Sequence, residues 1–208
     1  MKASFKRLFL DTATKSIYLC LLDGVQILET IYQEGMNDHS VTLFPTLETM
    51  LSNHQLQLKD LDEIIVGIGP GSYTGVRIGV SVVKMIGYVL PHIRIFSVSS
   101  LALLASSSSK EWILASMDAR RGNAFMAYYK QEQGRFTPII QDCLDAKHTI
   151  ESQINPQAVI VTSGIPNPIT ILQSGLIEEV FDIHTLTPNY LQATEAEKKQ
   201  GEQHGDHH

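Results

Sequence analysis

Residues 64–80 constrain the fold more than any other stretch of this chain. They read Ile-Ile-Val-Gly-Ile-Gly-Pro-Gly-Ser-Tyr-Thr-Gly-Val-Arg-Ile-Gly-Val. The β-branched apolar start is typical of a buried strand, and glycines with a proline then break it. The following residues, about 75–90, predict a helix that ends before Pro91. A strand, a glycine-rich turn and a helix can bind an anion, support chemistry, or simply let two segments approach closely.

Three standard motifs do not fit this turn. A phosphate-binding P-loop needs a lysine after its last glycine, and no lysine follows any glycine of the turn. A dinucleotide fingerprint needs a glycine where Thr74 stands, and a nucleophile elbow needs a serine where Tyr73 stands. Two interpretations remain: an anion-binding turn of another type, or a structural turn in which Ser72 or Thr74 caps the helix. The residues favour the structural one.

A helix-length stripe of small residues follows the turn. Gly75, Gly79, Val83 and Gly87 recur at every fourth position, and we call them the small-residue stripe. Such a face lets another element approach closely. The approaching element is either a helix of another protein or the sheet of this chain.

The two halves of the chain share one order of elements. Each has a strand ending in aspartate, a turn, two strands, a helix, a strand, a helix and a strand, with Asp11 and Asp118 in the same place. This pattern predicts two related α/β lobes around a cleft. A serine run at 106–109 is typical of a linker, so we predict lobes at 1–107 and 108–191. The polar residues 192–208 predict a disordered tail.

The charged residues near these turns leave alternatives open. Asp11 and Asp118 can hold a metal or a water, or can cap their own turns. Arg77 and Arg120 are candidates for phosphate or carboxylate contact, although an Arg-Arg-Gly turn is more often a solvated corner. The histidines lack the spacing of metal ligands, so the sequence predicts no metal site.

Composition excludes several classes of protein. A net charge of −6 argues against a broad nucleic-acid-binding face. Cys20 and Cys143 are too few and too far apart for a disulfide framework or a zinc site. The first residues lack the apolar segment of a signal peptide, and no apolar run reaches membrane-spanning length. These features predict a soluble cytoplasmic protein.

Several motifs together resemble the TsaB (YeaZ) family of bacterial tRNA threonylcarbamoyladenosine biosynthesis proteins. The strongest is Gly-Pro-Gly-Ser-Tyr-Thr-Gly-Val-Arg-Ile-Gly at 69–79. The others are Leu-Asp-Thr-Ala-Thr at 10–14, His-Ser at 39–40, Val-Ser-Ser-Leu at 98–101, Met-Asp-Ala-Arg-Arg-Gly at 117–122 and Pro-Asn-Tyr-Leu at 188–191. The similarity is dense over 8–129 and thin from there to 187.

The resemblance implies a fold and a function. The fold is the actin-like (ASKHA, ribonuclease H-like) α/β fold, with two lobes that each hold a mixed sheet flanked by helices. The function is that of a non-catalytic scaffold that binds and activates a TsaD-type transferase. With the TsaE-type ATPase, that complex modifies the adenosine next to the tRNA anticodon. TsaD relatives carry a pair of metal-binding histidines on the helix corresponding to residues 100–105, where this chain has no histidine.

The resemblance also implies partners and site residues. The chain pairs with the TsaD-type subunit, or with itself when alone, contacts tRNA only indirectly, and needs no cofactor, since ATP and magnesium belong to the partner subunits. The first two helices form the interface, with His39, Phe44, Leu47, Leu51, Gly75, Arg77, Gly79, Val83 and Gly87. A vestigial ligand cleft would hold Asp11, Thr12, Gly71, Ser72, Asp118 and Arg120.

Two enzymatic alternatives stand beside the scaffold. One is an ASKHA-type ATPase or kinase that uses Asp11 and the two turns to bind phosphate, although Thr12, Ala13 and Thr14 crowd a phosphate where actin-like loops have glycine. The other is a glycoprotease-like peptidase, for which the sequence contains no visible nucleophile–base pair or metal set.

Overall fold

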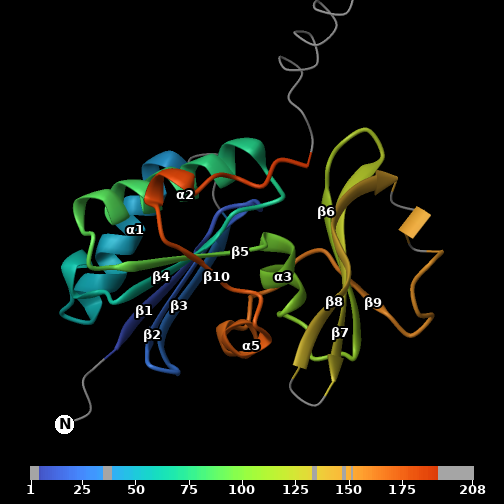
Figure 1. Cartoon of the computed structure of the whole chain (residues 1–208), viewed down its shortest axis with the longest axis horizontal. Helices are drawn as coiled ribbons and strands as arrows, with labels where there is room; N and C mark the ends of the chain where they lie inside the picture. Colours follow the sequence, from blue (N-terminus) through green and yellow to red (C-terminus); the bar gives the residue numbers. More distant parts are fainter. Residues whose placement is uncertain (1–4, 35–38, 133–134, 147–148, 151, 192–208) are drawn as a thin grey trace, which may run out of the picture.

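The structure is a computed structural model that describes residues 5–34, 39–132, 135–146, 149–150 and 152–191. It contains two sheets, with helices beside and between them (Figure 1). The tail predicted at 192–208 lies outside the described residues.

The first sheet has the strand order β10-β5-β4-β1-β2-β3. The chain opens with an antiparallel meander of β1 (Lys6–Asp11), β2 (Ser16–Asp23) and β3 (Gln26–Glu34), as predicted. β4 (Glu63–Gly67) pairs parallel to β1, and β5 (Arg94–Val98) pairs parallel to β4. Parallel neighbours need long crossover connections, and helices supply them here.

Two helices cover one face of this sheet (Figure 1). They are α1 (His39–Asn53) and α2 (Tyr73–Val89), with the short 3₁₀ helix η1 (Leu58–Asp60) between α1 and β4. The other face carries α3 (Ser100–Ala105), which lies between the two sheets. Ser99 caps α3, since its hydroxyl oxygen accepts from two backbone N–H groups of the first turn.

The second sheet has the order β8-β7-β6-β9. β6 (Trp112–Asp118), β7 (Asn123–Glu132) and β8 (Arg135–Ala146) form an antiparallel meander, and β9 (Val159–Val161) pairs parallel to β6. β8 is the longest of these strands, with 12 residues.

The end of the described chain returns to the first lobe, which corrects the predicted lobe boundary. After α5 (Pro168–Ser174), strand β10 (Glu178–Val180) pairs antiparallel with β5 in the first sheet. The 3₁₀ helix η2 (Ile183–Thr185) then contacts α2. The second lobe therefore does not extend to residue 191, because β10, within the range predicted for that lobe, forms the edge strand of the first sheet.

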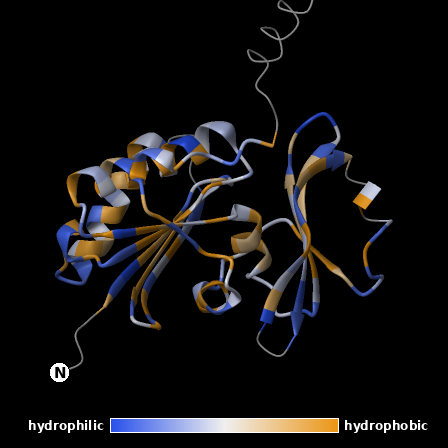
Figure 2. Cartoon of the chain, viewed as in Figure 1, coloured by the Kyte–Doolittle hydropathy of each residue, from blue (hydrophilic) through white to orange (hydrophobic). Residues whose placement is uncertain are grey.

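Of three buried apolar clusters in the described residues, one spans both lobes. Strand alternation sends Leu8 and Leu10 toward α1 and α2, and sends Phe9 to the opposite face. Phe9 shares a cluster with Ile113 and Ala127 of the second sheet, and α3 and α5 join the same cluster. Figure 2 shows hydrophobic residues along the strands and the helices that flank them. Apolar packing therefore fills the space between the sheets, which fixes how the lobes sit against each other.

Candidate functional site

The glycine-rich turn packs directly on the end of β1. A side chain at Gly67 would overlap the carboxylate of Asp11, and one at Gly71 would overlap the backbone of Ala13. The backbone N–H of Ser72 donates to the Ala13 carbonyl at 2.7 Å. These glycines are required because the glycine-rich turn and the end of β1 touch each other. Among the roles considered for this turn, the structure therefore supports the close approach of two segments.

Asp11 is the polar centre of this contact and is 5% exposed. Its Oδ1 accepts from the Ser100 hydroxyl at 2.8 Å and from the Ala13 N–H at 3.3 Å. The Ser100 hydroxyl in turn accepts from the Gly69 N–H at 2.9 Å. Burial raises the pKa of Asp11 to about 6, although these hydrogen bonds oppose the rise. The carboxyl group thus joins β1, α3 and the glycine turn.

Thr12 and Ser72 complete the contact. The Thr12 hydroxyl donates to the Gly75 carbonyl at 2.7 Å, and the Gly75 N–H donates to the Ser72 hydroxyl oxygen at 3.3 Å. Ser72 is therefore the N-cap of α2, as predicted. The structure brings together four of the six residues predicted for a ligand cleft: Asp11, Thr12, Gly71 and Ser72.

The other two predicted cleft residues lie on a separate, exposed turn. Asp118 ends β6 and accepts from the Arg120 N–H at 3.1 Å. Arg120 has a left-handed backbone with φ +65°, as does Arg121 with φ +54°. Asp118 therefore caps its own turn, the simpler of the two interpretations of this residue. Within the described ranges, no hydrogen bond or ion pair joins it to Asp11.

The small-residue stripe faces the chain's own sheet, so its assignment to an outward interface is wrong. A Cβ at Gly75 would overlap the Thr12 carbonyl, and one at Gly79 would lie 2.5 Å from the Thr12 hydroxyl. Val83 is fully buried, and a Cβ at Gly87 would lie 2.9 Å from Ile183 of η2. The stripe lets α2 approach β1 and η2, and it presents no side chain to a partner.

Three predicted interface residues of α1 are also buried in this chain. Leu47 and Leu51 belong to the core beneath α1. His39 is 9% exposed, and its Nε2 lies 3.1 Å from the Thr14 carbonyl oxygen. Phe44 is half-buried, and Arg77 is exposed. Only these last two, of the nine predicted interface residues, reach the surface substantially.

The outward side of α2 carries an exposed apolar surface, of which the sequence predicted only Arg77 as an interface residue. Four of its apolar side chains have large exposed fractions: 45% for Tyr73, 50% for Met85, 71% for Tyr88 and 66% for Val89. Arg77 lies among them, and it donates to the Tyr73 hydroxyl at 3.0 Å. We call these five residues the α2 outer face. The spacing of Tyr73, Arg77 and Met85 at multiples of four, opposite the glycines, is the signal that would have identified it.

The returning end of the chain borders this face. Lys84 donates from Nζ to the carbonyl oxygens of His184 and Leu186 at 3.0 and 3.1 Å. The rings of Tyr73 and Tyr190 have centroids 5.2 Å apart. The segment from η2 onward is therefore held along α2 by contacts at both of its ends.

Metal-binding and membrane-spanning features are missing from the part of the chain that the structure describes. There, no three His, Cys, Asp or Glu side chains are grouped to hold a metal ion. Over the same ranges, no helix is long and apolar enough to cross a bilayer.

Comparison with known proteins places these features in a family. The family model described as "TsaD: tRNA N6-adenosine threonylcarbamoyltransferase" matches residues 33–180, which is well over half of the chain. The tRNA threonylcarbamoyladenosine biosynthesis protein TsaB of Bacillus subtilis (strain 168) is 29% identical, over 92% of this chain and 96% of that protein. TsaB of Escherichia coli (strain K12) is also 29% identical, over 61% of this chain and 55% of that protein.

Solved structures support the fold. YeaZ from Pseudomonas aeruginosa superimposes with a TM-score of 0.74 at 24% identity, over 90% of this chain and all of that one. A second Pseudomonas aeruginosa structure, described as an uncharacterized protein with similarity to peptidase YEAZ, gives a TM-score of 0.76 over the same shares. Together with the two mixed sheets, these neighbours confirm the predicted actin-like α/β fold of two lobes.

Proposed function

Because the chain belongs to the TsaB (YeaZ) family of tRNA threonylcarbamoyladenosine biosynthesis proteins, we propose that it is a non-catalytic scaffold. In this proposal it binds and activates a TsaD-type transferase. The contact is made by the α2 outer face, with Phe44 of α1 at its border.

The exposure of large apolar side chains on α2 carries the proposal. Aromatic residues, methionine and arginine are enriched at protein interfaces, and all three kinds are present on this face. Tyr88 alone exposes 71% of its surface on a well-formed helix of 17 residues. Exposed apolar side chains that gather on one side of a helix, when its other side already packs in the core, are typical of a protein interaction site.

Two features of the site support a non-catalytic role. The family resemblance places the metal-binding histidines of TsaD relatives on the helix that corresponds to α3, and here all six residues of α3 are buried and none is a histidine. Asp11, which an ATPase or kinase of this fold would use, is engaged by Ser100 and Ala13 within the chain. Calorimetry with magnesium–ATP tests the enzymatic alternative, which predicts heat of binding to the isolated chain.

The remaining parts of the proposal concern assembly. We expect a homodimer through the same face when the chain is alone, and a larger complex that includes a TsaE-type ATPase. The net charge of −6 favours indirect rather than direct contact with tRNA. This assembly would act in the cytoplasm.

The test is complex formation with the cognate TsaD-type subunit, measured by gel filtration and titration calorimetry. We expect Tyr88→Asp to weaken binding by about 100-fold, because it places a charge where an aromatic anchor would be desolvated. Ile139→Arg is the matched control, since Ile139 is 52% exposed on β8 of the other lobe.

Two results would contradict the proposal. One is the absence of any complex with the unmodified chain. The other is equal weakening by Tyr88→Asp and Ile139→Arg, which would show that the α2 outer face has no special part. Circular dichroism of both variants confirms that a loss of binding is not a loss of folding.

A further inference from the structure

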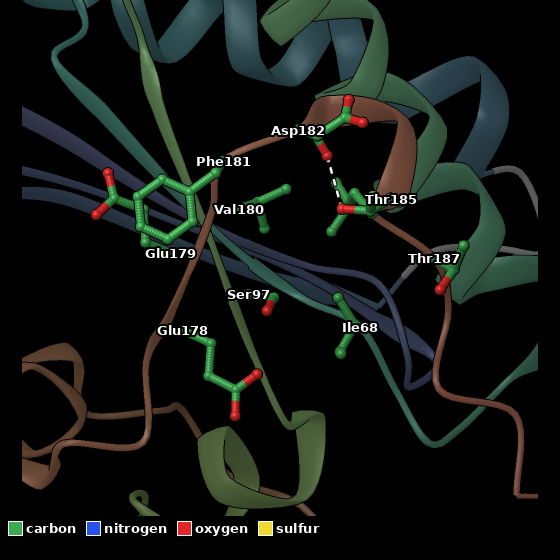
Figure 3. A pocket seen from close by; sticks show the side chains of 10 residues that line it. Ile68, Ser97, Glu178, Glu179, Val180, Phe181, Asp182, Thr185 and Thr187 are labelled. Atoms are coloured by element: carbon green, nitrogen blue, oxygen red, sulfur yellow. Dashed lines mark hydrogen bonds between the residues drawn. The ribbon is translucent and has the colours of Figure 1, made fainter.

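The chain after β10 returns across the first lobe to the glycine-rich turn. Figure 3 shows it turning at Asp182 and coming back past Thr187, with Ile68 lining the hollow between the two passes. The backbone N–H of Asn189 then donates to the carbonyl oxygen of Ile68 at 2.7 Å. A Cβ at Gly69 would lie 3.3 Å from the Asn189 carbonyl oxygen. The returning segment is therefore fixed on the turn by its backbone at Asn189.

Asp142 of β8 holds the same point from the second lobe. Its Oδ2 accepts from the side-chain amide of Asn189 at 3.2 Å, and its Oδ1 accepts from the Ser99 hydroxyl at 2.9 Å. Ser99 is also the N-cap of α3. Burial raises the pKa of Asp142, although both hydrogen bonds oppose the rise. One half-buried carboxyl group thus joins the second lobe, α3 and the returning segment.

Tyr190 lies between two anchored neighbours and is itself 46% exposed. Asn189 precedes it, and Leu191, which follows it, packs against the apolar cluster that spans both lobes. The ring centroids of Tyr190 and Tyr73 are 5.2 Å apart, with an angle of 31° between the ring planes. Because Tyr73 belongs to the α2 outer face, the exposed aromatic surface continues from α2 onto the returning segment.

An exposed tyrosine on a fixed backbone is well suited to binding another protein. Tyrosine is enriched among the residues that dominate binding energy, and it has only two side-chain torsions to order. A backbone that is already held in place loses little further conformational entropy when a partner covers it. Tyr190 therefore differs from an aromatic residue on a free terminus, whose ordering would oppose binding.

We propose that Tyr190 extends the α2 outer face as a contact for the TsaD-type subunit, and that Asp142 is the positioning residue that holds it there. This inference rests on the proposed function and adds to it a role for the second lobe. Asp142 acts only through Asn189, the neighbour of Tyr190. The partner that fits is a protein with an apolar surface broad enough to cover Tyr73 and Tyr190 together.

The test is titration calorimetry of the full chain and its variants with the cognate TsaD-type subunit. We expect Tyr190→Ala to weaken binding about tenfold through the loss of an aromatic contact. Asp142→Ala and Asn189→Ala should each weaken it several-fold, because they loosen the backbone that carries the ring. Adding Asp142→Ala to Tyr190→Ala should weaken it little further, since both act on one contact. Asp145→Ala, at an exposed carboxylate of β8, is the matched control and should bind like the unmodified chain.

An NMR measurement on the isolated chain separates positioning from a general loss of stability. Nuclear Overhauser contacts between the rings of Tyr73 and Tyr190 should be present in the unmodified chain and in Asp145→Ala. They should be lost in Asp142→Ala and in Asn189→Ala, while amide shifts in the rest of the chain are preserved. Asn189→Ala leaves the bond between Asp142 and α3 intact, so it keeps the test decisive if Asp142→Ala does not fold.

The outcomes distinguish this inference from the proposed function. Binding that is weakened by Tyr88→Asp but unchanged by Tyr190→Ala overturns this inference alone. Ring contacts that survive in both Asp142→Ala and Asn189→Ala also overturn it, as do fully additive losses in the double variant. The absence of any complex with the unmodified chain contradicts the proposed function and this inference together.

Discussion

The two sides of α2 have opposite kinds of side chain and opposite surroundings. The inner side carries the small-residue stripe, and Val83 within it is fully buried against the sheet. The outer side carries Tyr73, Met85 and Tyr88, each at least 45% exposed. Small residues thus serve contacts inside the chain, whereas large apolar residues remain uncovered.

This difference shows which side of α2 is available to a partner. A row of glycines permits close approach but says nothing about which element approaches, and here β1 and η2 fill the space. Uncovered aromatic residues are more informative, because burying them on association gains free energy. The small-residue stripe, which was predicted to meet a partner, therefore packs inside this chain, and the partner-binding face on the outer side of α2 remains our proposal.

The largest expected effect comes from adding a side chain on the inner side. Gly75→Val places methyl groups against the Thr12 carbonyl, and a backbone atom in a buried strand end cannot rotate away. We expect a loss of about 3 kcal/mol in the free energy of unfolding, measured by urea denaturation. Ser81→Val, on the exposed side of the same helix, is the control and should cost about 0.5 kcal/mol. Equal losses would mean that α2 does not pack through its glycines.

A second prediction tests the polar contact beneath the inner side. Burial raises the pKa of Asp11 from 3.8 to about 6, so the folded state holds this proton more tightly than the unfolded chain. The stabilising contribution of the protonated form is complete below about pH 4 and is lost as the pH rises through about 6. Asp11→Asn removes the titration and keeps an acceptor for Ser100. From pH 4 to 7, it should therefore gain stability relative to the unmodified chain by up to about 3 kcal/mol.

The measurement is a pair of urea denaturation series across that pH window. Every other titrating group, including Asp142 with its raised pKa, is common to both proteins and cancels in the difference. Parallel stability curves would show that Asp11 titrates as an ordinary exposed carboxyl group. A variant that loses stability with rising pH as the unmodified chain does would lead to the same conclusion.

Local patterns predicted the first lobe well. The three opening strands, the helix cap at Ser72, and the helix after the glycine turn follow from periodicity and capping chemistry, which act over a few residues. The fold class also followed, because the resemblance rests on motifs within this lobe. Local rules succeed where the nearest neighbours in sequence decide the structure.

Features set by distant contacts could not be predicted in this way. The pairing of β10 with β5 joins residues more than eighty positions apart. A strand of three residues is also too short to show a periodicity from which its neighbouring strand could be predicted. Ser106, read as part of a linker, is 3% exposed and accepts from the Asn167 N–H. The burial of the small-residue stripe depends likewise on where β1 and η2 lie.

The sharpest test of the comparison is a matched pair of truncations two residues apart on α2. Val83→Ala removes buried methyl groups from the inner side and should cost about 2 kcal/mol in the free energy of unfolding. Met85→Ala acts on a side chain that is half exposed, and it should change that free energy by less than about 0.5 kcal/mol. Valine and methionine differ in helix propensity by only a few tenths of a kcal/mol, roughly, which is small beside the expected contrast. If Met85→Ala instead matches Val83→Ala in stability, the outer face is already covered in the isolated chain, and the division between an inner core side and an outer partner side does not hold.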